Sequence, residues 1–368
     1  MINFERSNNG LGAINLCFMA GKNSQLGYTN GISCLTSQIL LNGSKNYKKH
    51  QLIYKPNQYG GAINIGVSDT FTCINARCLD SNIENMVELL YSMIFESEFN
   101  DLEKQKRITR EVNTNTMNDP FKILLDRLYQ NTVDRKFGSL YLTDDFNDIT
   151  LNEVKRFHKE KYVNPSVAIM SSNNKVIDLV HSLTCKYNIE TGSPINDFNS
   201  EFAIKHDEFN WKISTNNRML LTFVIDQSPI YDILTSVYQY RINKLLRMDK
   251  ALCSRNRCMI LPFGNKKRLF IVDIEFSNYD NKDEIINDIM NIMNSGYSKK
   301  EFDISKSQLI GNILYDICDP LRNVVMNCER LILGQCGINR LIEEIESCTY
   351  KESLSTPKKD FNYVIGVR

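Results

Sequence analysis

The chain has 368 residues, of which 42% are hydrophobic and 24% are charged, a balance typical of a folded protein and not of a disordered tail or a fibre. Its 44 Lys and Arg side chains against 43 Asp and Glu give a formal net charge of +1, so no global field favours nucleic acid or an anionic membrane as a partner. The length predicts roughly two domains, each with its own core.

The sequence also carries no targeting or membrane signal. Residues 1–10 contain no apolar stretch of signal-peptide length, and the longest apolar run, 219–225, is far shorter than the roughly 20 residues that a bilayer requires. We therefore expect a cytoplasmic protein without membrane association. The 11 cysteines, from Cys17 to Cys348, form no Cys-x-x-Cys pair, and this odd number favours free, mostly buried thiols over a disulfide framework.

The first half of the chain alternates strand and helix patterns. Apolar spacing with a period of two or about 3.6 residues, together with capping and breaking residues, locates these elements. The patterns predict strands at 11–20, 62–67, 71–79 and 166–171, and helices at 32–43, from a capping box at 81–84, at 101–118, from Pro120, and from a capping box at 150–153.

A polar segment at 189–206, which contains Gly192-Ser193-Pro194, has the composition of a surface linker. Beyond it the same order of elements returns, with strands at 218–226, 258–263 and 268–276 and helices beginning near 228, 280, 300, 320 and 338. We therefore predict two tandem homologous domains, 1–188 and 207–368. The predicted fold class is α+β, with an antiparallel-rich sheet packed against helices in each domain.

Four segments of the first half match a known family in order and spacing. The segment 31–44, Gly-Ile-Ser-Cys-Leu-Thr-Ser-Gln-Ile-Leu-Leu-Asn-Gly-Ser, resembles the inverted zinc-binding helix Gly-x-Ala-His-Phe-Leu-Glu-His-Met-Leu-Phe-Lys-Gly-Thr. The segments 60–64, 118–120 and 157–162 resemble that family's Gly-Gly-x-x-Asn, Asp-Asn-Pro and Phe-x-x-x-x-Tyr. The chain therefore resembles the insulinase/pitrilysin metallopeptidases, in their mitochondrial-processing-peptidase-like branch, and the likeness spans nearly the whole chain.

The resemblance implies that the zinc motif is degenerate. In the family, two histidines bind zinc and the glutamate between them activates the metal-bound water. Cys34, Ser37 and Gln38 stand at these three positions, and a hydroxyl and an amide neither bind zinc at ordinary affinity nor accept a proton from water near neutral pH. Glu111 is the nearest match to the third ligand, but it precedes Pro120 by nine residues where the family typically has eight, and one residue turns a helical side chain by about 100°. We expect no metal site and no catalytic centre in this chain.

No other catalytic site emerges from the sequence. The four histidines are His50, His158, His181 and His206, and none lies three or four residues from another, as a helical two-histidine metal site requires. No glycine-rich phosphate loop is present. Cys34 near a helix start is a candidate nucleophile, although no histidine partner is visible beside it in the sequence.

Two further segments carry expected substrate contacts. The segment 241–254 resembles the family's Ser-Arg-Leu-Phe-x-x-Leu-Arg-Glu-Lys-Arg-Gly-Leu-Ala-Tyr, in which the later Arg and the Tyr reach the substrate. Arg247 matches that Arg, and Ser254 replaces the Tyr. In the family, the strand after Gly-Gly-x-x-Asn is an exposed edge that takes the peptide as an added strand, so Asn64, Ile65 and Gly66 are expected to bind substrate. An ordinary strand inside its own sheet explains this segment equally well.

The resemblance favours a pseudo-peptidase. It implies a non-catalytic subunit that forms a heterodimer with a zinc-bearing paralogue and processes a peptide, for which the leader of a ribosomally made modified peptide or bacteriocin is a plausible example. One alternative is a structural subunit of a larger complex, like the peptidase-derived core proteins of a respiratory complex. Another is a hydrolase that uses Cys34 or an unrecognised metal site. A homodimer also stays open.

Overall fold

The computed structural model describes residues 2–117, 119–132, 146–189, 206–210, 216–263, 267–355 and 361–367. These residues form two compact units that are described separately. Unit 1 comprises 1–113, 143–195 and 314–338, and unit 2 comprises 114–142, 196–313 and 339–368.

Unit 1 contains a five-stranded sheet in the order β1-β5-β2-β4-β3. The strands are β1 (Ile2–Arg6), β2 (Leu11–Phe18), β3 (Ala62–Val67), β4 (Thr72–Leu79) and β5 (Ser166–Ser171). Only β1 and β5 pair in parallel, while the β5-β2, β2-β4 and β4-β3 pairs are antiparallel. Strand β3 is therefore an edge strand that pairs on one side only, as the expected substrate edge requires, while its binding of substrate stays a prediction.

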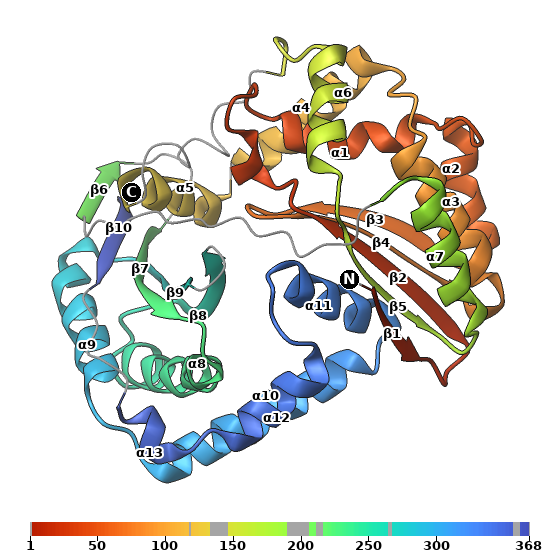
Figure 1. The fold of residues 1–368 in the computed structure, drawn as a ribbon. Helices are drawn as coiled ribbons and strands as arrows, with labels where there is room; N and C mark the ends of the chain where they lie inside the picture. The colour runs from red at the N-terminus through yellow and green to blue at the C-terminus, as the bar shows by residue number, and fades with distance from the viewer. Residues whose placement is uncertain are drawn as a thin grey trace. The chain divides into compact units, whose positions relative to one another are not determined.

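Helices cover both faces of this sheet (Figure 1). One face, with Ile14, Leu16 and Ile74, packs into the main core together with residues of five helices. The other face, with Ala13, Cys17 and other small residues, packs against a single helix near the C-terminus. The helices of unit 1 are α1 (Ile32–Ile39), α2 (Lys49–Gln58), α3 (Ile83–Phe95), α6 (Leu151–Lys161), α7 (Lys175–Lys186) and, on the second face, α11 (Pro320–Ile332).

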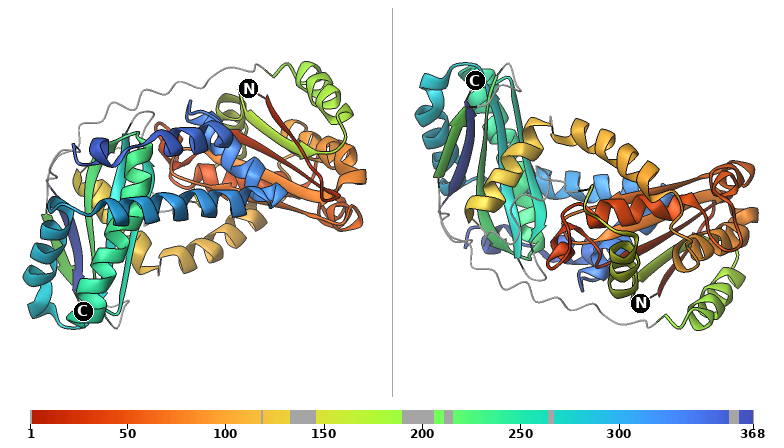
Figure 2. Two further views of the ribbon diagram at one scale, coloured as in Figure 1. Left: turned by 90° about the horizontal axis from the view of Figure 1, so that it is seen from below. Right: turned by 90° about the horizontal axis from the view of Figure 1, so that it is seen from above.

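Unit 2 repeats this topology with β6-β10-β7-β9-β8. Each strand stands five places later in the chain than its counterpart, and β6 and β10 are again the parallel pair. The strands are β6 (His206–Asn210), β7 (Asn217–Asp226), β8 (Arg255–Phe263), β9 (Lys267–Phe276) and β10 (Asn362–Val367). Helices α8 (Pro229–Ile242) and α9 (Lys282–Asn294) lie along this sheet (Figure 2).

The two units exchange one helix each. Helix α5 (Pro120–Thr132) follows the strands of the first half, yet its Ile123, Leu124 and Leu128 pack on the sheet of unit 2. Helix α11 follows the strands of the second half and packs on the sheet of unit 1. Helices α4 (Leu102–Met117) and α10 (Lys299–Ile317) span the points where the chain changes unit, and α12 (Ile338–Ser347) and α13 (Tyr350–Ser353) follow in unit 2.

The structure confirms the predicted fold class of two α+β repeats. The units differ from the predicted contiguous ranges 1–188 and 207–368 by the exchanged segments, so those ranges stay a prediction for the homologous halves. Most of the expected linker, 190–205, lies outside the described residues. No described helix has the length and apolar character needed to cross a bilayer.

Two local expectations need correction. The predicted capping box at 81–84 does not form, because α3 begins after Asn82 without a side-chain cap and a short 3-10 turn precedes it. The expectation of free cysteines fails for one pair, since Cys17 and Cys73 form a disulfide. These cysteines are directly opposite each other on β2 and β4. Their pairing depends on strand register, which cysteine spacing alone does not reveal.

Candidate functional site

Helix α1 carries the degenerate zinc motif and is held by its own local structure. It begins after Gly31, whose φ of 91° favours glycine, and a Cβ there would lie 2.6 Å from the Phe146 ring. The Gln25 side-chain oxygen accepts hydrogen bonds from the backbone N–H groups of Gly31 and Ser33 at 2.9 and 3.2 Å. A side chain from outside the helix thus satisfies donors at the start of the helix.

The three motif positions differ in their surroundings. Cys34 and Gln38, at the places of the two histidines, are half-buried, and their spacing of four residues puts them on one side of α1. Ser37, at the place of the catalytic glutamate, is fully buried, and its hydroxyl donates to the Cys34 carbonyl oxygen at 2.8 Å. The Ser37 hydroxyl is therefore committed to the helix backbone.

A buried aromatic pair on the neighbouring helix α6 supports this position. The rings of His158 and Tyr162 stack at 4.8 Å, and burial raises the pKa of Tyr162, with Cys34 as a further contributor. Burial lowers the pKa of His158 to about 4, so the ring is neutral near pH 7. Its buried Nε2 has no hydrogen-bond partner among the described residues. Cys34 and His158 therefore do not form the hydrogen-bonded pair that a thiol nucleophile requires.

Glu111 is placed on α4 as an exposed side chain. No ion pair or hydrogen bond of Glu111 is found within the described residues. Among all residues that the structure describes, no group of three or more His, Cys, Asp or Glu side chains is arranged to hold a metal ion.

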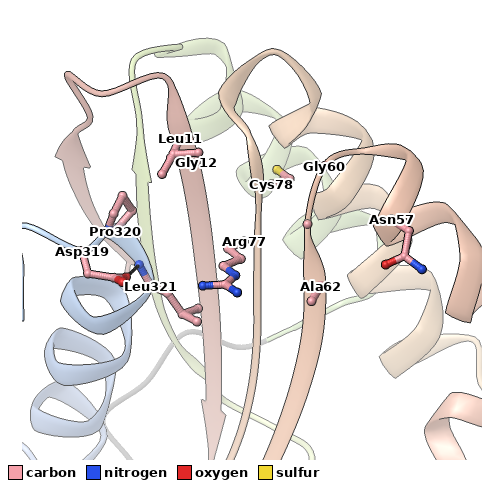
Figure 3. A pocket seen from close by; sticks show the side chains of 11 residues that line it. Leu11, Gly12, Asn57, Gly60, Ala62, Arg77, Cys78, Asp319, Pro320 and Leu321 are labelled. Atoms are coloured by element: carbon pink, nitrogen blue, oxygen red, sulfur yellow. Dashed lines mark hydrogen bonds between the residues drawn. The ribbon is translucent and has the colours of Figure 1, made fainter.

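The edge strand β3 offers main-chain groups to a partner. Its Ile63 and Ile65 pack against the main core, whereas Asn64 and Gly66 are exposed. Among the described residues, the main chain of Ala62–Val67 hydrogen-bonds only with β4. Figure 3 shows the start of this strand at Gly60 and Ala62, beside Arg77 of β4. The outer side of β3 can therefore pair with an extended peptide.

The corresponding edge strand of unit 2, β8, is closed by a side chain. The Gln239 amide of α8 accepts a hydrogen bond from the Cys258 backbone N–H at 2.6 Å. The same amide donates to the Asn256 carbonyl oxygen at 3.4 Å and to its side-chain oxygen at 2.6 Å. Because Gln239 occupies main-chain groups that an added strand would use, the two repeats differ in their capacity for strand addition.

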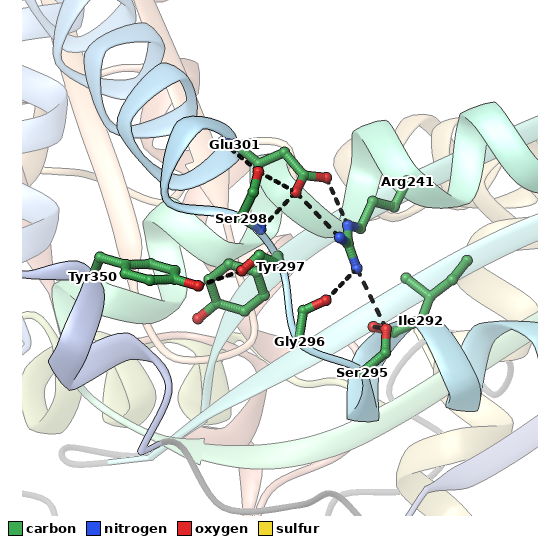
Figure 4. A network of polar contacts seen from close by, with 8 residues as sticks. All are labelled: Arg241, Ile292, Ser295, Gly296, Tyr297, Ser298, Glu301 and Tyr350. Atoms are coloured by element: carbon green, nitrogen blue, oxygen red, sulfur yellow. Dashed lines mark hydrogen bonds and ion pairs between the residues drawn. The ribbon is translucent and has the colours of Figure 1, made fainter.

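The segment predicted to contact substrate in the second half lies in unit 2. It starts at Arg241, whose guanidinium binds Glu301 through two hydrogen bonds of 2.7 and 3.1 Å and also donates to the Gly296 carbonyl oxygen at 2.9 Å (Figure 4). Glu301 in turn accepts from the Ser298 backbone N–H at 2.7 Å. Mainly because Arg241 donates to it, the pKa of Glu301 falls to about 2. This network ties α8 to the loop before α10.

Arg247 and Ser254 follow on a π-helical turn, Asn243–Asp249, and the residues after it. Arg247 is exposed and makes no hydrogen bond or ion pair within the described residues. The Ser254 hydroxyl donates to the Glu275 carbonyl oxygen at 3.2 Å, so it bonds to the inner strand β9. Arg247 is thus available to a ligand, and the expected substrate contacts of Arg247 and Ser254 stay predictions.

Sequence reasoning missed three residues that shape these surfaces. Gln25 caps α1, Gln239 bonds to the edge of β8, and Arg77 stands near β3 on the sheet face that α11 covers. For Arg77 the only available signal was its place in a predicted strand, where a charge interrupts apolar residues. The roles of Gln25 and Gln239 depend on contacts between separate elements and leave no periodic pattern.

Comparison with known proteins agrees with this architecture. Residues 4–144 match the sequence profile of the family Insulinase (Peptidase family M16), which confirms the resemblance over this part of the chain. A search of curated protein sequences finds no match. Among solved structures, the fold is similar to the peptidase M16 inactive domain from Pseudomonas fluorescens, with 15% identity, a TM-score of 0.83, and coverage of 99% of this chain and 95% of that chain.

Two further structures share the fold. A protease from Helicobacter pylori has 12% identity and a TM-score of 0.82, with 99% of this chain and 96% of that chain covered. A chain of complex III2 from Candida albicans, bound to Inz-5, has 13% identity and a TM-score of 0.79, with coverage of 99% and 93%. At these identities the likeness shows the fold alone.

Proposed function

We propose that this insulinase-like chain is the non-catalytic subunit of a two-subunit zinc peptidase, which binds peptide and leaves the chemistry to a zinc-bearing paralogue. The observation that carries the proposal is the state of α1. Its scaffold is intact, yet Cys34, Ser37 and Gln38 replace the groups that hold zinc and activate water, and Ser37 is fully buried. The likeness to an inactive domain of the same fold supports this proposal.

Peptide binding does not require the lost groups. Main-chain groups on the outer side of β3 have no partner in the described part of the chain, and strand addition uses only such groups. The closed edge of β8 leaves β3 as the preferred site. The exposed and unpaired Arg247 has the charge to hold a peptide carbonyl or carboxylate. We propose Asn64, Ile65, Gly66 and Arg247 as the peptide-binding residues.

The partner and the substrate follow from the same proposal. A chamber completed by a second, zinc-bearing subunit makes the loss of the motif in this chain tolerable. The substrate is a peptide, with the leader of a ribosomally made modified peptide or bacteriocin as the class to examine first, and we propose the cytoplasm as its compartment.

The test compares the chain alone, a zinc-bearing paralogue alone, and their mixture. Zinc content and cleavage of a quenched fluorescent peptide are measured for each. We expect cleavage only in the mixture, with Cys34→Ala unchanged and Arg247→Ala strongly reduced. Lys244→Ala is the matched control, because Lys244 is an exposed cation on the same turn. Equal cleavage by the chain alone would overturn the proposal.

A second candidate is a structural subunit of a larger assembly. It is favoured by the similarity over nearly the full length to a chain of complex III2. In that case the chain copurifies with a stable complex, and neither the edge of β3 nor Arg247 affects any peptide-dependent activity. Stoichiometric copurification together with unchanged activity of the Arg247→Ala variant would favour this alternative.

A further inference from the structure

A cavity in unit 1 lies beside the start of the open edge strand. It has a volume of about 450 Å³, which is within the range of small-ligand sites. We call it the Arg77 cavity. Its lining includes Gly12, Gly60, Ala62, Arg77, Asp319 and Leu321. Figure 3 shows Arg77 between the first turn of α11 and the start of β3.

The cavity exists because the neighbours of Arg77 on the sheet are small. Arg77 on β4 is directly opposite Ala62 on β3 and Ala13 on β2, and their methyl groups leave space on both sides of the long side chain. Gly61 approaches the β4 backbone so closely that a Cβ would lie 1.7 Å from the Arg77 carbonyl oxygen. Ala62 and Gly61 are walls of the cavity, so a larger residue at 62 would fill part of it, and any side chain at 61 would displace β4.

The guanidinium of Arg77 has no counter-charge at contact distance. It forms no hydrogen bond or ion pair with any described residue. Asp319 lines the same cavity, but its Oδ1 accepts from the backbone N–H groups of Leu321 and Arg322 at 2.8 and 3.1 Å as the cap of α11. Because Asp319 already brings one negative charge to the cavity and Arg77 brings one positive charge, a ligand with a single negative charge fits better than a dianion.

Unit 2 shows the contrasting arrangement on the equivalent sheet. There Arg218 binds Asp273 through two hydrogen bonds of 2.7 Å, and Arg257 lies 3.5 Å from the same carboxylate. These two cations are therefore neutralised within the unit. In unit 1 the matching row crosses all five strands through Ala62, Arg77, Ala13, Met170 and Glu5. Its one carboxylate, Glu5, stands three strands away from Arg77 and accepts hydrogen bonds from Asn323 and Asn327 at 2.7 and 3.0 Å. Unit 1, in which the edge of β3 is open, thus also contains Arg77, whose guanidinium has no ion pair with any described residue.

The position of the cavity relates this charge to a peptide on β3. Strand β3 begins at Ala62, which is also a wall of the cavity. A peptide that adds antiparallel to β3 runs toward Ala62, so its C-terminal end reaches the cavity. A parallel peptide would present its N-terminal ammonium group there, and Arg77 would repel it. A guanidinium presents two N–H groups that match a carboxylate.

We propose that the Arg77 cavity binds the C-terminal carboxylate of a peptide that pairs antiparallel with β3. This inference rests on the proposed peptide-binding function, and it adds an orientation and a requirement for a free peptide end. Apolar walls from Leu11, Pro320 and Leu321 favour a small apolar side chain on the last peptide residue.

The test is fluorescence anisotropy with a labelled peptide of alternating Ala and Thr, offered as the free acid, as the C-terminal amide, and as an amide with Glu in the last place. We expect the free acid to bind about 10-fold more tightly than the plain amide. Arg77→Gln should remove this preference, and Arg77→Lys should keep part of it. Arg107→Gln is the matched control, because Arg107 is an exposed arginine of the same unit; we expect it to leave the preference unchanged.

The outcomes separate this inference from the function on which it rests. Equal affinities of acid and amide, or an unchanged preference in Arg77→Gln, would overturn the inference and leave peptide binding standing. If the amide with a terminal Glu bound as tightly as the free acid, the assignment to a C-terminus would be wrong. If the chain bound no peptide at all, both proposals would be overturned.

Discussion

The buried ion pair between Arg218 and Asp273 offers a sharp test of how unit 2 is neutralised. The side chains are 9% and 2% exposed, and two hydrogen bonds of 2.7 Å join them. The Arg218→Met substitution keeps a long apolar side chain and removes the charge. Asp273 would then retain only Arg257, which is 44% exposed and lies 3.5 Å away.

The expected loss follows from this geometry. Breaking a buried pair by removing one partner costs about 3–5 kcal/mol, because a charge is left buried without compensation. Because Arg257 still lies near Asp273 in this variant, we expect a loss of stability at the lower end of this range, about 3 kcal/mol. At about 2–4 °C per kcal/mol for a unit of this size, the melting temperature should fall by roughly 6–12 °C. The double substitution Arg218→Met with Asp273→Leu should stay within about 1 kcal/mol of the unchanged protein, since an apolar pair replaces the ionic one.

Urea unfolding followed by circular dichroism measures these free energies. Arg255→Met is the matched control, because Arg255 is an exposed arginine without an ion pair in the described part of the chain. It should change the stability by less than about 0.5 kcal/mol. If Arg218→Met and Arg255→Met lost the same small amount, the ion pair would not stabilise the sheet. If the double substitution were as damaging as the single one, the cost would come from packing and not from an unpaired charge.

Three further predictions concern the network at α8, the motif helix and the disulfide. The pKa of Glu301 is lowered to about 2, mainly by Arg241. The contribution of its carboxylate to stability is therefore present above the ordinary Glu value of about 4.5 and is lost as the pH falls toward 2. In Glu301→Gln the urea midpoint should depend less on pH over this interval, and an unchanged pH dependence would refute the assignment. Cys34→His with Gln38→His should raise the Zn²⁺ content by metal analysis above that of the unchanged chain, because the two half-buried positions share one side of α1, whereas Cys34→His alone should gain little. Thiol titration of the denatured, unreduced protein should find nine free cysteines, and a count of eleven would contradict the cross-strand disulfide.

Much of the fold was readable in the sequence where local chemistry dominates. The strand predicted at 166–171 is β5 without a change of bounds, and the helix predicted from Pro320 starts there because proline suits the first turn. Thr150 caps α6 as expected, with its hydroxyl accepting from the Glu153 N–H at 3.2 Å. The other half of that box failed: Glu153 accepts instead from the Thr29 N–H at 2.7 Å. A tertiary partner competed for the carboxylate.

The site divides in the same way. Sequence alone established that α1 keeps a motif frame with neutral groups at Cys34, Ser37 and Gln38, because the frame is local to one helix. It did not reveal that Ser37 is turned into the core, since burial depends on what packs against a helix. It also missed that Gln239 of α8 bonds to the edge of β8. A contact between a side chain and a strand of another element produces no periodic pattern in the sequence.

Composition and periodicity thus determined two α+β repeats and the loss of the zinc-binding groups, because secondary structure and side-chain chemistry act over a few residues. Only the tertiary structure decided that α5 and α11 are exchanged between the units, that Cys17 meets Cys73, and that Arg77 stands uncompensated beside the edge of β3. Each of these depends on strand register or on packing between segments far apart in the chain. Such pairings arise from burial of matching surfaces, which a linear pattern does not encode.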